Sequence, residues 1–188
     1  MEHQKIHNIA FIDGQNLYRG LDWDLDYARF RVYLRDKYHI EEAYYFIGYK
    51  WTEDTLYENL TEAGFIVIFN EKGDMLKSNK KWNIDVTLVF YAMKYYFDQK
   101  YDQALIVSGD GDFKILVDFL IERGKFAKVL APNIKYCSSL YNKTHIYPIN
   151  MLHISLFWRT SSNTKEKRAS RSTNTFGRFP LILDTGTF

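Results

Sequence analysis

Apolar positions along the chain fall into two patterns, short continuous runs and longer stretches with helical spacing. Continuous runs such as Ile9-Ala10-Phe11-Ile12 are typical of strands covered on both faces of a parallel sheet. They predict strands at residues 9–12, 43–47, 65–69, 105–107 and 126–130, with a short one near 146. The helically spaced stretches predict helices at residues 26–38, 54–63, 85–97 and 112–122, with a short one around 138–142. This alternation predicts an α/β domain in which helices cover both faces of a mainly parallel sheet.

Two polar segments interrupt the alternation. Residues 70–81 are rich in lysine and predict a loop. Residues 160–178 are rich in Ser, Thr, Asn, Lys and Arg, a composition that predicts disorder. We therefore expect a folded domain at residues 1–158 and a basic, disordered tail at residues 159–188. The apolar segment at 179–183 suits docking on the domain or on a partner, and the sequence leaves both open.

Composition and charge narrow the class of protein. The chain has 188 residues, 46% of them hydrophobic, which is enough for one domain with its own core. Its formal net charge is +2, and the basic tail accounts for that excess, which suits either a polyanionic partner or a plain solubilising terminus. The apolar runs are far shorter than a bilayer span, the first residues are too polar for a signal peptide, and a single cysteine excludes an intrachain disulfide. We expect a cytoplasmic protein without a membrane partner.

Four aspartates follow strands or open helices. Ser108-Gly109-Asp110-Gly111-Asp112-Phe113 lies between a predicted strand and a predicted helix, and Asp13 follows the first strand. If these two strands are neighbours, their ends face one crevice, where parallel sheets bind ligands. Asp85 and Asp112 each open the apolar stripe of a helix, Asp112 ahead of Ile115 and Leu116, so these residues are expected to face the sheet.

Each of these acids also has a structural explanation. Asp112 suits a helix N-cap, Asp85 suits a first helical turn, and Asp13 and Asp110 suit turns beside glycine. Taken together, four carboxylates in one crevice would repel one another, which raises their pKa values or requires a cation. No His or Cys lies in these segments, and an all-oxygen site indicates a hard ion, Mg²⁺ or Mn²⁺.

Other sites fit the sequence poorly. Gly109-Asp110-Gly111 lacks the third glycine of a dinucleotide fingerprint, and no Gly-Lys-Ser/Thr of a P-loop follows it. An EF-hand loop fails because Lys114 and Ile121 stand at ligand positions. A haloacid-dehalogenase phosphatase needs a second Asp two residues after Asp13, and a receiver domain needs an acidic pair before it. The histidines show no metal-ligand spacing, and Cys137 is interpreted as a small hydrophobic residue.

Three motifs together carry a family resemblance. They are Phe11-Ile12-Asp13-Gly14-Gln15-Asn16-Leu17, Lys81-Trp82-Asn83-Ile84-Asp85-Val86 and Val107-Ser108-Gly109-Asp110-Gly111-Asp112-Phe113, with Gly124-Lys125 after the third. In this order they resemble the NYN domain, more closely its LabA-like branch, a relative of PIN nucleases. The likeness covers residues 6–150. It implies a PIN-like three-layer α/β/α sandwich and metal-dependent hydrolysis of RNA.

The resemblance also implies roles for individual residues. The four aspartates correspond to the acidic site, as metal ligands and catalytic residues: Asp13, Asp85, Asp110 and Asp112. Asn16 corresponds to their polar companion. Trp82 departs from the family pattern, in which glycine is frequent, and this puts the shape of the substrate-side loop in question.

Residues near the acids suit contacts with an RNA substrate, and one alternative function is left open. Lys80 and Lys81 suit sequence-independent contacts with the RNA backbone, although a solvated loop explains them equally well. Ser108 is placed on the substrate side or as a brace of its turn. The alternative is an NYN domain without useful catalysis that binds RNA or protein; the complete acidic set favours an enzyme. A homodimer is left open.

Overall fold

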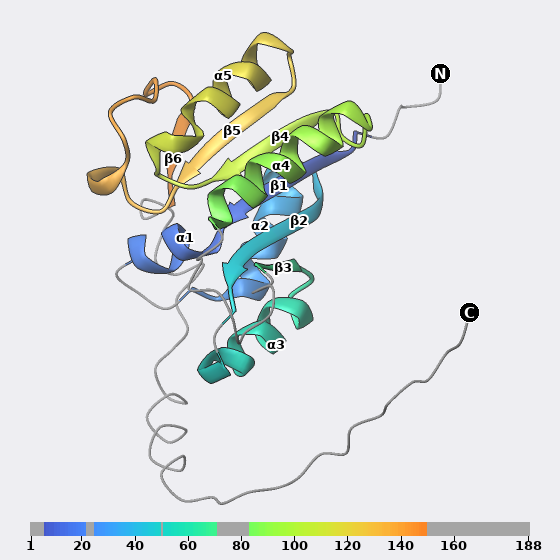
Figure 1. Ribbon diagram of the computed structural model, residues 1–188, viewed down its shortest axis with the longest axis vertical. Coiled ribbons are helices and arrows are strands. Elements are labelled where there is room, and N and C mark those ends of the chain that lie inside the picture. The colour runs from blue at the N-terminus through green and yellow to red at the C-terminus, as the bar shows by residue number, and fades with distance from the viewer. Residues whose placement is uncertain (1–5, 22–24, 50, 71–82, 150–188) are drawn as a thin grey trace, which may run out of the picture. The chain divides into compact units, whose positions relative to one another are not determined.

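The structure is a computed structural model that describes residues 6–21, 25–49, 51–70 and 83–149. Within these residues, six parallel strands form one sheet in the order β3-β2-β1-β4-β5-β6 (Figure 1). The strands are β1 (Asn8–Asp13), β2 (Ile40–Gly48), β3 (Ile66–Asn70), β4 (Gln103–Val107), β5 (Phe126–Ala131) and β6 (Ile146–Pro148). The predicted tail at 159–188 and all but the first residue of the predicted loop at 70–81 lie outside the described residues.

Helices cover both faces of this sheet, as the alternating pattern predicted. They are α1 (Gly14–Gly20), α2 (Tyr27–Tyr38), α3 (Asp54–Glu62), α4 (Ile84–Phe97) and α5 (Lys114–Glu122), with short 3₁₀ turns η1 (Trp51–Glu53), η2 (Gly111–Phe113) and η3 (Ile134–Tyr136). Buried side chains of α1, α2 and α3 form one apolar core with residues on one face of the sheet. Those of α4 and α5 form a second core on the other face. The predicted α/β fold is confirmed.

The direction in which the chain crosses the sheet reverses between β1 and β4. From β1 the chain builds outward through β2 and β3, and it then returns to β4 and builds the other half. β1 and β4 are parallel neighbours, with Ile12 beside Val107 at their ends. The expected adjacency of these strands is therefore confirmed, and the loops after them open at a topological switch point.

Three local expectations differ from the structure. Helix α1 follows β1 directly and was not predicted. The short helix expected at 138–142 is not formed in this described segment, and a 3₁₀ turn capped by Asn133, η3, lies just before it. Asp112 lies in η2 rather than in α5, and Ile115, expected to face the sheet, is 83% exposed.

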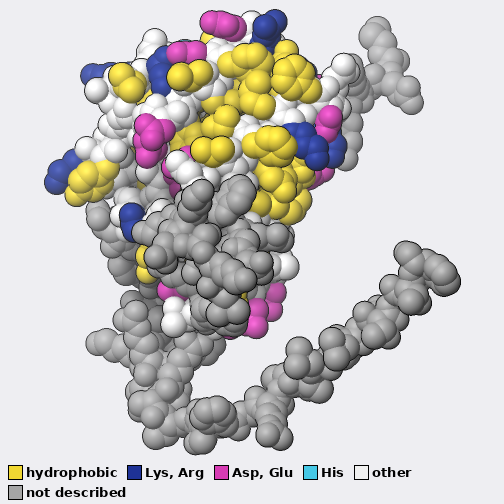
Figure 2. All heavy atoms as spheres, viewed as in Figure 1, with side chains coloured by type: hydrophobic (Ala, Val, Ile, Leu, Met, Phe, Trp, Pro, Cys, Tyr) yellow, Lys and Arg dark blue, Asp and Glu magenta, His cyan; other side chains and the backbone are white. Residues whose placement is uncertain are grey.

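Apolar side chains also gather on an outer surface. Figure 2 shows them on the face where α4 and α5 lie, and Phe90, Phe97 and Ile115 are among the exposed ones. Helix α4 is therefore apolar toward the sheet, through Leu88 and Ala92, and also toward solvent. No helix among the described residues has the length and apolar character needed to span a bilayer.

The junction of β1 and α1 depends on glycine. A Cβ on Gly14 would lie 2.3 Å from Cε1 of Tyr45 and 2.8 Å from the carbonyl oxygen of Phe46. Gly14→Ala should therefore lower the free energy of unfolding by about 2 kcal/mol, the usual effect of overpacking, in urea denaturation. Gly48→Ala is the control, since a Cβ there meets nothing within 4 Å. An equal loss in both variants would contradict the prediction.

Candidate active site

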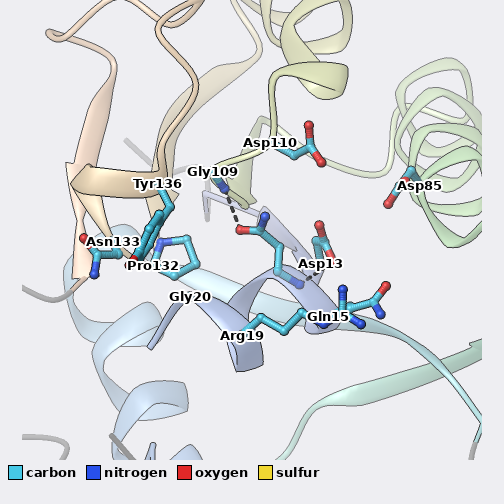
Figure 3. Close-up of a pocket in the computed structure, with 11 residues that line it drawn as sticks. Asp13, Gln15, Arg19, Gly20, Asp85, Gly109, Asp110, Pro132, Asn133 and Tyr136 are labelled. Atoms are coloured by element: carbon cyan, nitrogen blue, oxygen red, sulfur yellow. Dashed lines mark hydrogen bonds between the residues drawn. The ribbon is translucent and has the colours of Figure 1, made fainter. Parts of the chain in front are cut away.

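Three of the four predicted acids face one pocket at the carboxyl edge of the sheet. Asp13 is the last residue of β1, Asp110 follows β4, and Asp85 lies in the first turn of α4. All three line a pocket of about 340 Å³. Figure 3 shows their carboxylates directed toward the same space. Asp112 lines an adjoining hollow together with Asp110, so it stands at the rim.

Asp13 is the most deeply buried of these acids, with 5% of its surface exposed. Its Oδ1 accepts a hydrogen bond from the backbone N–H of Asn16 at 3.0 Å, which caps α1. Its Oδ2 accepts a hydrogen bond from the hydroxyl of Ser108 at 3.1 Å. Burial raises the pKa of Asp13, and these hydrogen bonds partly oppose the rise because they favour the charged form.

Further hydrogen bonds tie the loop after β1 to the loop after β4. Oδ1 of Asn16 accepts from the N–H of Gly109 at 2.8 Å, and Oγ of Ser108 accepts from the N–H of Asp110 at 3.1 Å. Asp110 in turn caps η2, because its Oδ1 accepts from the N–H of Asp112 at 3.1 Å. Ser108 has no exposed surface and is not among the residues that line the pocket. Its contacts brace the turn.

The pKa of Asp85 reflects its burial and the charges of the neighbouring acids. The position of this residue is set by Asn83, whose side chain caps α4 by accepting from the N–H of Asp85 at 2.9 Å. Burial raises the pKa of Asp85 to about 6, with further contributions from the charges of Asp13, Asp110 and Asp112. The neighbouring carboxylates therefore destabilise the charged form of Asp85, as the sequence predicted for an acid that shares a crevice with others.

The donor chemistry of the pocket suits a hard divalent cation. The candidate ligands are all carboxylate oxygens, and the mutual repulsion of these groups would be relieved by a positive ion. Among the described residues, no three His, Cys, Asp or Glu side chains stand close enough together to hold a metal ion. Coordination of one ion by three of the aspartates therefore requires them to lie closer together than they do in this structure.

Comparisons with known proteins identify the family. The model of the NYN domain family matches residues 8–149, a range that contains all four aspartates. The chain belongs to the NYN domain family. The low amplitude and bright protein LabA of Synechococcus elongatus is 26% identical over 150 residues, which cover 73% of this chain and 80% of LabA. A crystal structure of a protein of unknown function from Vibrio parahaemolyticus has a TM-score of 0.60 at 20% identity, over 79% of this chain and 95% of that one. The latter similarity concerns the fold alone.

One wall of the pocket of this NYN domain was not found from the sequence. It comprises residues from α1 and from the segment after β5: Gln15, Arg19, Gly20, Pro132, Asn133 and Tyr136. The rule that placed Asp13 and Asp110 at strand ends applies equally to the residues that follow β5, and it would have found Asn133 and Tyr136. Arg19 was not identified as a pocket residue because helix α1, which carries it, was not predicted. Lys80 and Lys81 lie outside the described residues.

The raised pKa of Asp85 gives this NYN domain a measurable pH dependence. The pKa of about 6 in the folded state exceeds the ordinary 3.8, so the stability contributed by protonated Asp85 is complete below the lower value. It is lost as pH rises through the higher value. Asp85→Asn should therefore raise the unfolding free energy of the metal-free protein by about 1 kcal/mol near pH 8, after allowance for solvent screening, and leave it unchanged below about pH 4.

Urea denaturation in EDTA across this pH range measures the effect. Asp54→Asn is the matched control, because Asp54 lies in the first turn of α3 as Asp85 does in α4. That control should lose a few tenths of a kcal/mol at neutral pH, since a charge that favours the helix dipole is removed. A loss of stability in Asp85→Asn near pH 8 would contradict the prediction.

Proposed function

We propose that this NYN domain is a ribonuclease that hydrolyses RNA phosphodiester bonds with a carboxylate-bound Mg²⁺ or Mn²⁺. The observation that carries the proposal is the convergence of Asp13, Asp85 and Asp110, from three separate segments, on one pocket. The raised pKa of Asp85 supports it, because such shifts are frequent at functional sites. Membership of the NYN family, a relative of PIN nucleases, supports RNA as the substrate.

The cation would be held by Asp13, Asp85 and Asp110. A divalent ion bound there would lower the pKa of a water molecule and neutralise charge that develops on the phosphate. Asp13 is the least mobile ligand, because hydrogen bonds from Asn16 and Ser108 hold both of its oxygens. Asp85 and Asp110 then supply the charge on either side of it.

Asn16 and Asp112 take supporting roles in this proposal. Oδ1 of Asn16 is engaged by the N–H of Gly109, which leaves its Nδ2 to donate a hydrogen bond to a phosphate oxygen. Asp112 is exposed at the rim beside Asp110, where its carboxylate can accept a hydrogen bond from the attacking water. Both residues therefore act on groups that the acids bring into the pocket.

The central test is cleavage of labelled single-stranded and structured RNA by the variant Asp85→Asn/Asp110→Asn. In Mg²⁺ or Mn²⁺ its initial rate should fall by about 100-fold or more, because several kcal/mol of charge stabilisation is lost. EDTA should abolish wild-type cleavage. Asp118→Asn is the control, since Asp118 pairs with Lys114 on α5 and does not line the pocket. Cleavage that survives the double substitution or the chelator would exclude the metal-nuclease mechanism.

The separation of the carboxylates favours one alternative, an NYN domain that binds RNA or protein without cleaving RNA. It predicts RNA affinity in the wild type and no cleavage in Mg²⁺ or Mn²⁺. Purified protein assayed for both properties on the same RNA distinguishes the two functions.

Metal binding can be tested without RNA. Mn²⁺ at about 100 times its Kd should raise the melting temperature of the wild type by roughly 5–10 °C, and EDTA should reverse the shift. Asp13→Asn should lose this response while it keeps its fold, because Asn caps a helix as well as Asp does. Calorimetry or thermal scanning measures both. Equal shifts in the two proteins would place the bound ion elsewhere.

A further inference from the structure

The pocket has two unlike walls. The acids line one side of it and Pro132 and Tyr136 line another, with Arg19 at the end of α1 also among the lining residues. Figure 3 shows Tyr136 and Pro132 together on the side opposite Asp85. Among the residues that line the pocket, Arg19 is the one with a positive side chain. A metal site made of carboxylates does not require an arginine or an aromatic ring. The presence of these side chains in the pocket therefore needs a separate explanation.

Tyr136 presents an aromatic ring to solvent at the edge of the pocket. It is 64% exposed, and it lines both the pocket and the adjoining hollow beside Asp110 and Asp112. The rings of Tyr44 and Tyr45, by contrast, are buried in the two cores. Nζ of Lys135 lies 5.4 Å from the centroid of the Tyr136 ring, which adds positive charge beside it. Core packing therefore does not account for this ring.

The backbone that carries Tyr136 is held against the acidic turn. The N–H of Tyr136 donates to the carbonyl of Asn133 at 3.2 Å, and the N–H of Ser138 donates to the carbonyl of Gly109 at 2.8 Å. The second bond connects the segment after β5 directly to the turn that carries Asp110. The backbone that carries the ring is thus positioned relative to the acidic turn before any substrate binds.

Arg19 lines the same pocket from another element. It lies in the last turn of α1, and within the described residues its guanidinium has no ion-pair partner. The end of α1 is packed against the segment after β5, since a Cβ on Gly20 would lie 2.6 Å from Cβ of Pro132. Arg19 and Tyr136 therefore line the same pocket, which adds a cation and an aromatic face to the acids.

We propose that this pocket binds the nucleotide next to the scissile phosphate, with its base stacked on Tyr136 and its phosphate paired with Arg19. Stacking on a protein ring requires an unpaired base, so the substrate class is single-stranded RNA. A pocket of about 340 Å³ is at the small end of ligand sites and suits one nucleotide. The position of the scissile bond rests on the proposed ribonuclease function, whereas binding of the nucleotide does not.

The experiment measures affinity in the full chain carrying Asp85→Asn, which prevents cleavage of the probe. Fluorescence anisotropy follows a short fluorescein-labelled oligoadenylate, the same strand annealed to its complement, and a strand of equal length with abasic sites. Tyr136→Ala should weaken binding of the single strand about tenfold, within the range for one stacked base. Tyr136→Phe should bind like its parent because the ring is kept. The duplex and the abasic strand should not respond to either substitution.

Two further variants separate stacking from charge. Tyr18→Ala is the matched control, because Tyr18 is 67% exposed on α1 and does not line the pocket. It should leave affinity unchanged. Arg19→Gln should weaken binding of both the intact and the abasic single strand, and it should reduce the dependence of log K on log salt by about one unit. Circular dichroism confirms that each variant is folded.

The outcomes distinguish this inference from the proposed function. Single-strand affinity that is unchanged in Tyr136→Ala, or a duplex that binds as tightly as the single strand, would overturn the inference, even if metal-dependent cleavage is found. Affinity that depends on Tyr136 in a protein that cleaves no RNA would support the nucleotide site and refute the ribonuclease. Absence of binding to all three probes would overturn the inference as well.

Discussion

The two hydrogen bonds to the carboxylate of Asp13 are the interaction on which the site depends. They join the end of β1 to the start of α1 and to the end of β4, across the point where the order of the strands reverses. Ser108, which makes one of them, also accepts from the N–H of Asp110. Because a single buried serine contacts both acids, the loops after the two central strands are positioned together rather than independently.

The sequence left two interpretations of the aspartates open, as helix caps or turn residues and as a cation site, and the structure shows that the two are compatible. Asp13 caps α1, Asp110 caps η2, and Asn83 caps α4 beside Asp85. The same carboxylates line the pocket or stand next to it. Helical segments thus begin where the acids gather, and the partial positive charge of their first turns offsets part of the repulsion among the carboxylates. Capping is the means by which the carboxylates of Asp13 and Asp110 are held in place.

The central part of the fold and the acidic side of the pocket could be predicted from local pattern alone. Continuous apolar runs identified the strands, and the rule for strand ends in parallel sheets brought Asp13 and Asp110 together. Helix α1 was missed because Gly14-Gln15-Asn16 has the composition of a turn, and the Asp13 cap and packing against β2 outweigh that local preference. Ile115 was misplaced because η2 displaces the start of α5 from the position assumed for it. The rule for strand ends also applies to the segment after β5 that holds Tyr136, whereas Arg19 depends on α1, which the local pattern does not indicate.

The length of helix α1 sets the distance between the two walls of the pocket. Arg19 follows Asp13 by six residues of one short helix, a rise of roughly 9 Å along its axis. Close packing prevents this rod from sliding, with Gly14 against Tyr45 at one end and Gly20 against Pro132 at the other. The spacing between the buried carboxylate and the arginine is therefore a property of helix length and of two glycines. A longer or shorter α1 would change the distance between Arg19 and Asp13 by a fixed amount for each residue. The number of residues in this helix therefore sets how far along an extended ligand the pocket can make contacts.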